Sequence, residues 1–165
     1  MVSLKILELN RFMARLLKSE AFDDFLLREG SVRTYMEYRF QGRLHKEYFE
    51  TAEQERYADR EYALWGEVRP FFLELIKGKR TPLAIRLELM LPEQEARKLF
   101  LEKQVSVSEE TFPTLSFQLR FENGVARLLT GVSQSAFSLD RSKEEAWDMG
   151  VKQLLHTMEI PIEQE

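Results

Sequence analysis

The chain has 165 residues, of which 44% are hydrophobic and 32% are charged. These values are typical of one globular domain with a buried core, and they exclude a disordered or fibrous chain. Its 24 basic and 28 acidic residues give a formal net charge of −4, which disfavours a nucleic-acid-binding protein because phosphate contacts require a cationic face. The chain has no cysteine, so disulfides, thiolate metal sites and cysteine nucleophiles are excluded.

The sequence carries no recognisable targeting or membrane signal. Its longest apolar runs are far shorter than the roughly 20 residues needed to span a bilayer. Its first residues lack the basic stretch, long apolar run and small-residue cleavage site of a secretory signal. We therefore expect a soluble, cytoplasmic protein with no membrane partner.

The first residues are predicted to form a strand and a helix. Residues 2–7 favour a short strand, and Asn10 is expected to cap the helix that follows it. Residues 19–28 fit a further helical turn, which Gly30 would end.

A hairpin is predicted over residues 32–49, with a two-residue turn at Gln41-Gly42. That register places Tyr38 opposite His45. Both faces of this hairpin are mixed in polarity, so we expect it to lie near an edge of the sheet.

The central part contains a clear helical pattern. Thr51 to Gln54 resembles a capping box at the start of a short helix. Trp65 to Ile76 places aromatic and aliphatic residues on one helical face, with Pro70 expected in a first turn or at a kink. Gly78 is expected just beyond the end of this helix.

Two strictly alternating segments predict regular strands. Residues 83–91 alternate between apolar and polar positions, and Pro92 is then expected at the first position of a short helix. Residues 115–121 alternate again. The Asn123-Gly124 pair that follows is a strong signal for a tight hairpin, whose second strand is expected over 125–132.

The last part is predicted to form a brief strand and a terminal helix. The strand is expected over 136–139, and Ser142 to Glu145 forms a second capping box. Apolar residues then continue at helical spacing to Met158. Gly150 inside this helix costs about 1 kcal/mol relative to alanine, so we expect it to allow a close contact.

Together these elements predict a single two-layer α+β domain over residues 1–165. Its sheet is expected to be mostly antiparallel, with about six strands and with helices packed on one face. The domain has three consecutive segments. Residues 2–49 contain the N-terminal helix and hairpin, and residues 50–103 contain the central helix, strand and short helix. Residues 112–158 contain the C-terminal hairpin and helix.

A basic turn between the central helix and the strand after it is the first candidate site. It consists of Lys77, Gly78, Lys79 and Arg80. Cationic side chains beside a glycine can hold a phosphate, a carboxylate or an acidic partner through charge-assisted hydrogen bonds. Cations at a helix C-terminus also stabilise the helix dipole without any ligand, so the sequence leaves both interpretations open.

A pair of arginines is the second candidate site. A two-residue Asn123-Gly124 loop places Arg120 directly opposite Arg127 on the polar face of the C-terminal hairpin. Like charges in such a pair are destabilising. A bound anion would relieve the repulsion, and so would a carboxylate from Glu122 or Glu88; we expect one of these carboxylates to do so.

No catalytic or metal-binding motif is present, and we expect neither a metal nor a cofactor. The two histidines, His45 and His156, are expected at the surface. Aromatic and basic residues near the first hairpin could form a surface for single-stranded nucleic acid, although the net charge of the chain opposes this. The tyrosines concerned are Tyr35, Tyr48, Tyr57 and Tyr62.

Short motifs distributed over nearly the whole chain resemble one known family. They are Phe22–Leu27, Gly42–Lys46, Trp65 with Pro70, Leu75–Pro82, Phe137–Asp140 and Trp147-Asp148. Together they resemble an uncharacterised family of small proteins from anaerobic Gram-positive bacteria, classed as a domain of unknown function. The resemblance implies a bacterial cytosolic single-domain protein, places Lys77-Gly78-Lys79 in a family-like signature, and implies no activity or catalytic residue.

The residues favour a non-enzymatic module that binds a ligand or a protein, which includes a second copy of the chain in a homodimer. The binding surface would be the basic turn Lys77–Arg80 or the polar face of the sheet. An enzyme acting on a small anionic substrate near Arg120 and Arg127 is the alternative. Single-stranded nucleic-acid binding is a third and less favoured hypothesis.

Overall fold

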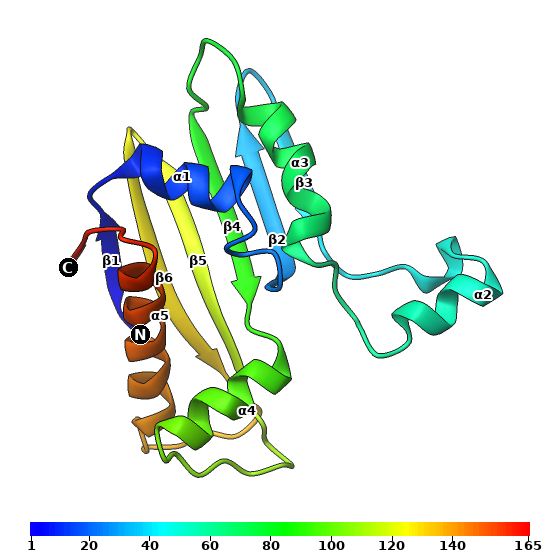
Figure 1. Cartoon of the computed structure of the whole chain (residues 1–165), viewed down its shortest axis with the longest axis vertical. Helices are drawn as coiled ribbons and strands as arrows, with labels where there is room; N and C mark the ends of the chain where they lie inside the picture. Colours follow the sequence, from blue (N-terminus) through cyan, green and yellow to red (C-terminus); the bar gives the residue numbers. More distant parts are fainter.

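A seven-stranded, wholly antiparallel sheet organises the chain in the computed structural model, which describes residues 1–165 (Figure 1). Its spatial order is β3-β2-β4-β5-β6-β1-β7. The strands are β1 (Ser3–Ile6), β2 (Leu26–Arg33), β3 (Glu37–Gln41), β4 (Ala84–Met90), β5 (Thr114–Glu122), β6 (Val125–Ser133) and β7 (Ile162–Gln164). The predicted α+β class is confirmed, with seven strands in place of about six.

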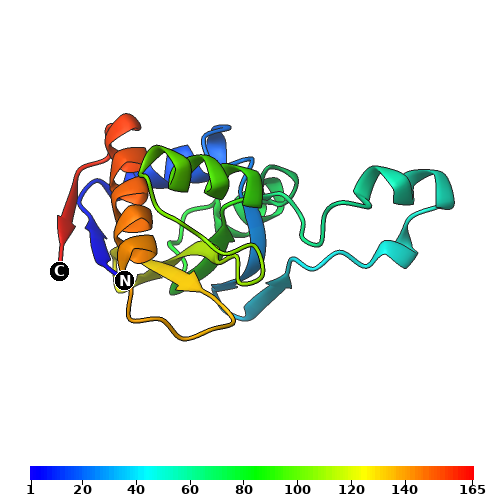
Figure 2. The ribbon, with the colours of Figure 1, turned by 90° about the horizontal axis from the view of Figure 1, so that it is seen from below.

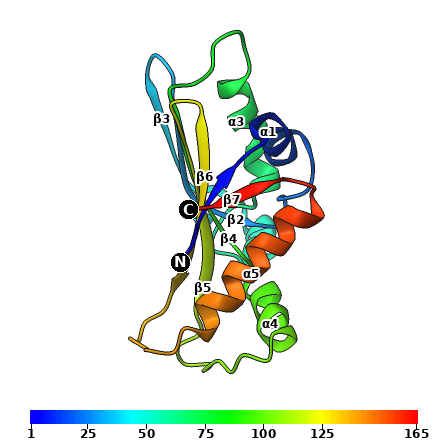
Figure 3. The same cartoon turned by 90° about the vertical axis from the view of Figure 1, so that its left-hand side faces the viewer.

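Four of the five α-helices cover one face of this sheet and leave the other face open (Figure 3). The covering helices are α1 (Leu9–Lys18), α3 (Trp65–Ile76), α4 (Glu93–Glu102) and α5 (Ser142–Thr157). The fifth helix, α2 (Thr51–Gln54), lies away from the sheet with the 3₁₀ turns η1 (Lys46–Tyr48) and η2 (Glu55–Tyr57). None of the helices is long and apolar enough to cross a bilayer.

The core lies between the sheet and its covering helices. Alternate strand residues such as Ile85, Leu119 and Leu128 point into it and are almost fully buried. Both tryptophans are buried there with their indole N–H groups satisfied. The Nε1 of Trp65 donates to the Leu16 carbonyl at 2.8 Å, and the Nε1 of Trp147 donates to the Ser116 carbonyl at 2.6 Å. Both residues thus join helices to neighbouring elements without leaving a polar atom unpaired.

The first hairpin differs from the prediction in the position of its turn. Strands β2 and β3 turn at residues 34–36, and Val32 lies opposite Tyr38. Gly42 lies beyond the end of β3 and is not part of the turn. A Cβ atom at Gly42 would lie 1.8 Å from the carbonyl oxygen of Leu27. A close approach of two backbone segments, and not a tight turn, therefore requires this glycine.

Gly30 was expected to end a helical turn, but it lies in the middle of strand β2. A Cβ atom at this position would be 2.7 Å from Cζ of Phe72 on α3. The Phe72 ring also packs against Phe40, with 4.6 Å between the ring centroids. The helical turn considered for residues 19–28 does not form an α-helix, because residues 19–25 form only turns and bends and strand β2 begins at Leu26.

Three predicted helix caps are displaced by one or two residues. Helix α1 has Glu8 and not Asn10 at its N-cap position. Thr51 and Ser142 are each the first helical residue of α2 and α5, and neither caps its helix. The side chain of Asp140 accepts a hydrogen bond of 2.9 Å from the Ser142 N–H, which satisfies one donor near the start of α5.

The remaining predictions hold with small changes, except for the strand expected over 136–139, which is wrong. The hairpin at Asn123-Gly124 forms as expected, with positive φ angles of 54° and 77°. Gly150 makes the expected close contact, because a Cβ atom there would lie 3.3 Å from the methyl groups of Leu99 on α4. Pro70 lies in the second turn of α3, and Pro92 precedes α4 as its N-cap. Residues 136–139 form no strand.

Residues 43–64, which we name the arm, extend away from the body of the protein (Figure 2). At its base Leu44 N donates to the Glu61 carbonyl and Ala63 N donates to the Gly42 carbonyl, each at 2.8 Å. The arm replaces the second strand that was predicted up to residue 49. No residue of the arm is fully buried.

We expect the Gly42→Ala variant to lower the free energy of unfolding by about 1–3 kcal/mol, because its Cβ would force two backbone segments apart. Gly131→Ala is the matched control, since the nearest atom to its Cβ would be the Ser116 Oγ at 3.3 Å and the nearest backbone atom would lie at 4.0 Å. Urea unfolding followed by circular dichroism measures both variants. Equal stability of the two variants would show that the approach of Gly42 to Leu27 is not a constraint.

Candidate functional site

A row of cationic side chains crosses the open face of the sheet. The register pairs Ser31 with Arg39 and with Arg86, Arg86 with Arg120, Arg120 with Arg127, and Arg127 with Lys5. One line of neighbours across six strands therefore contains five cations, which we name the cationic row: Lys5, Arg39, Arg86, Arg120 and Arg127. The predicted opposition of Arg120 and Arg127 is confirmed by this register.

Carboxylates neutralise the cationic row toward both of its ends. The Nε and Nη2 atoms of Arg127 donate to the Glu165 carboxylate at 2.6 and 3.3 Å. This hydrogen bonding lowers the pKa of the Glu165 carboxyl group and raises the pKa of Arg127. At the other end, the Nη2 of Arg39 lies 3.2 Å from the Glu37 carboxylate.

The middle of the cationic row has no such partner. Arg86 and Arg120 form no ion pair with a carboxylate, and Arg120 donates only to the neutral Oε1 of Gln118 at 2.9 Å. Both side chains are exposed. Two arginines at directly opposite positions of β4 and β5 therefore have no carboxylate partner.

The carboxylates expected to relieve this repulsion are engaged elsewhere. Glu122 pairs with Arg33 at 3.2 Å, and Glu88 lies 3.6 Å from Arg28. The expectation that one of them neutralises the arginine pair is therefore wrong. Glu165 neutralises Arg127 alone. It directly follows β7, a strand that the sequence did not predict.

A shallow depression of about 680 Å³ lies on the open face over β2, β3, β4 and β5. Its lining contains four arginines and four glutamates, so it is formally neutral. Arg33 and Arg39 are paired within it, whereas Arg86 and Arg120 are not. Arg127 lies outside the depression. The two free guanidinium groups can therefore hold an anionic group at this place through charge-assisted hydrogen bonds.

The basic turn lies at the end of α3, as expected, and is separate from the cationic row. Gly78 follows the last residues of the helix with a φ of 137°, a conformation that favours glycine. The Nζ of Lys77 lies 2.7 Å from the Glu74 carboxylate of the same helix. Lys79 and Arg80 are exposed and form no hydrogen bond or ion pair through their side chains. Termination of the helix therefore explains why Gly78 and Lys77 occur here. Lys79 and Arg80 remain as two cations without a partner.

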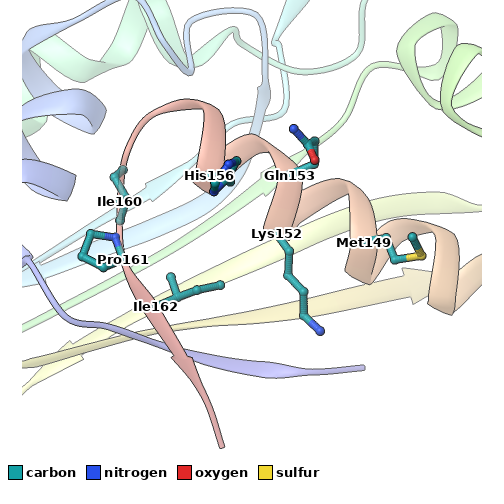
Figure 4. Close-up of a pocket in the computed structure, with 7 residues that line it drawn as sticks. All are labelled: Met149, Lys152, Gln153, His156, Ile160, Pro161 and Ile162. Atoms are coloured by element: carbon teal, nitrogen blue, oxygen red, sulfur yellow. The ribbon is translucent and has the colours of Figure 1, made fainter.

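A second depression, of about 470 Å³, lies between α5 and the segment leading into β7 (Figure 4). His156 and Lys152 line it from α5, opposite Ile160 and Pro161. The Nζ of Lys152 donates to the Gln164 side chain at 2.7 Å. This depression therefore offers mainly apolar contacts, and it contains none of the residues that the sequence singled out as a binding site.

The other candidate residues are dispersed. His45 lies in the arm and His156 on α5, both exposed, and no group of three or more acidic or histidine side chains is placed to hold a metal ion. Tyr48, Tyr57 and Tyr62 also belong to the arm, away from the open sheet face. The register places no aromatic residue on the open face of any strand. The predicted basic-aromatic surface is therefore not formed by a hairpin.

The sequence did not identify Lys5, Arg39 and Arg86 as neighbours of the arginine pair. Each lies at an alternating polar position of a strand. This alternation was the only feature of the sequence that could place these side chains on the open face. Strand β4 pairs with β5, and β1 pairs with β6, only after long connections, while β2 and β4 lie between β3 and β5. No local turn therefore sets the register that brings these residues into one row.

No curated protein and no solved structure matches this chain. The expected relationship to an uncharacterised family is confirmed. Since the model of the family of unknown function DUF5721 matches residues 15–163, which is most of the chain, the protein belongs to that family.

Proposed function

We propose that this protein is a non-enzymatic binding module whose open sheet face holds an anionic group of its ligand or partner between Arg86 and Arg120. One observation carries the proposal: two arginines at directly opposite strand positions line a depression, and neither has a carboxylate partner. Side chains that are directly opposite on antiparallel strands have Cβ atoms about 4.5–5.5 Å apart. An oxyanion between two such side chains accepts hydrogen bonds from both and removes their repulsion.

The geometry favours an anionic group over a nucleic-acid base. Proteins that bind single strands without sequence preference stack the bases on aromatic side chains, and the open face presents none. A depression of about 680 Å³ has the size of a small-molecule site or of the tip of a protein segment. The ligand would place its negative charge at Arg86 and Arg120, with hydrogen-bond donors toward the unpaired Glu29 at the rim.

An enzyme acting near Arg120 and Arg127 is less favoured, because the two arginines do not line the same depression. Arg120 lines the depression, whereas Arg127 is held by Glu165 outside it. The basic turn remains the second candidate for anion binding, since Lys79 and Arg80 are free. A cytoplasmic location in an anaerobic Gram-positive bacterium belongs to the same proposal and rests on the sequence resemblance alone.

We expect Arg86→Gln and Arg120→Gln each to weaken binding of inorganic pyrophosphate about tenfold or more, because each removes a charge-assisted hydrogen bond. Isothermal titration calorimetry at low salt measures the affinity. Arg15→Gln is the matched control, since Arg15 is an exposed cation on α1 without an ion pair. Affinity that is unchanged in both sheet variants, or absent from natural protein that sedimentation shows to be monomeric, would refute the proposed site.

The triple variant Lys77→Ala, Lys79→Ala, Arg80→Ala separates the two candidate sites. We expect it to keep most of the pyrophosphate affinity, because the turn lies outside the depression. The same titration, with thermal unfolding as a check of folding, gives the result. A loss of affinity in this variant with unchanged stability would move the anion site to the basic turn.

A further inference from the structure

The arm lacks the packing that normally holds a segment of its length in place. Its residues include Tyr48, which is 85% exposed, and the side chains of Phe49 and Tyr57 stack on each other with 4.3 Å between their centroids. Between residues 46 and 59 every hydrogen bond and ion pair is made within residues 45–60. Ordering a chain segment costs about 1–2 kcal/mol per residue, so such an arm gains stability when a partner covers it.

The outer part of the arm is acidic. Residues 46–60 contain five acidic and three basic side chains, a formal net charge of −2. Among its cations, Arg60 pairs with Glu67 of α3, Lys46 donates to the Ala58 carbonyl, and Arg56 lies over the Tyr57 ring. Four carboxylates form no ion pair with a basic side chain: Glu50, Glu53, Glu55 and Asp59. The arm therefore presents unpaired negative charge, as the depression presents unpaired positive charge.

The arm does not cover the depression of its own chain. It leaves the body directly after Gln41, which lines the depression, but it extends outward from the edge of the sheet (Figures 1 and 2). The unpaired carboxylates and the unpaired arginines of one molecule are therefore apart. Two molecules related by a twofold axis can each place an arm over the sheet of the other, because such an interface is closed and self-complementary.

We infer that the anionic partner of Arg86 and Arg120 is the acidic arm of a second copy of this chain, in a reciprocal homodimer. The inference rests on the proposed anion-binding function of the open sheet face, and it identifies the partner that this face binds. In the dimer, Glu50, Glu53 and Glu55 of each copy lie against the two arginines of the other. Tyr48 loses its solvent exposure on the same surface. Opposite charges across such an interface favour the correct pairing and steer the association of the two copies.

Charge exchange between two variants provides a direct test. The arm variant carries Glu50→Lys, Glu53→Lys and Glu55→Lys, and the sheet variant carries Arg86→Glu and Arg120→Glu. Each variant alone places like charges at both contacts of a dimer, so we expect its dimer dissociation constant to rise at least tenfold. Mixed together, they place opposite charges at both contacts, so we expect a heterodimer to form. Sedimentation velocity over a range of protein concentrations and salt measures each state.

A control variant carries Glu102→Lys and Glu110→Lys, which reverse exposed, unpaired carboxylates outside the arm. We expect it to dimerise like the natural protein. Circular dichroism verifies that all variants are folded. A natural protein that stays monomeric at every concentration, dimers that persist in both charge-reversed variants, or a mixture that remains monomeric would each overturn the inference.

Titration with pyrophosphate tests the anion site independently of the dimer. The arm variant retains Arg86 and Arg120, so it should bind pyrophosphate whether or not the protein dimerises. A monomeric natural protein that binds pyrophosphate through these arginines would refute the dimer and leave the anion site intact. Loss of pyrophosphate binding in the arm variant, with the fold preserved, would remove the anion site as well.

Discussion

The ring of Phe72 lies over strand β2 at the place where Gly30 has no side chain, and the layout of the open face depends on this contact. Phe72 packs at the same time against Phe40 and Trp65, with ring centroids 4.6 and 5.0 Å apart. Helix α3 is thereby fixed across β2 and β3. Side chains of a strand alternate between its two faces, so burying one face determines that Ser31 points to the other, beside Arg86.

The same apolar face explains why the sheet tolerates a row of like charges. A shift of the register by one residue would move every buried side chain of a strand into solvent. Burial of a side chain such as Leu87 contributes about 1.5–3 kcal/mol, and strands β4 and β5 each bury several such side chains. An unfavourable pair of like charges costs a few tenths of a kcal/mol to about 1 kcal/mol. The register is therefore set by the core, and the cationic row follows from it with or without a ligand.

The fold was predicted where the signals in the sequence are local. The hairpin of β5 and β6 is set by Asn123-Gly124, so the opposition of Arg120 and Arg127 could be deduced from the order of the residues alone. Arg86 could not be placed beside Arg120, because a whole helix and a long loop separate their strands. Gly30 and Gly42 were misinterpreted for a related reason: both are required by contacts with distant or non-adjacent backbone and side chains, and a sequence does not distinguish such glycines from glycines in turns.

The bulge in β2 connects the arm to the free arginines. The register of β2 against β4 shifts between Leu27 and Glu29, which leaves Arg28 as the additional residue. The Arg28 side chain approaches Glu88, and its carbonyl accepts the N–H of Gly42 at 2.9 Å, where the arm begins. Arg28 thus pairs with the carboxylate of Glu88, which lines the same depression as Arg86 and Arg120. The carbonyl of Arg28 also holds the chain at the base of the arm. Arg28 therefore links the carboxylate of Glu88, which its side chain approaches on the sheet, to Gly42, from which the chain continues into the arm.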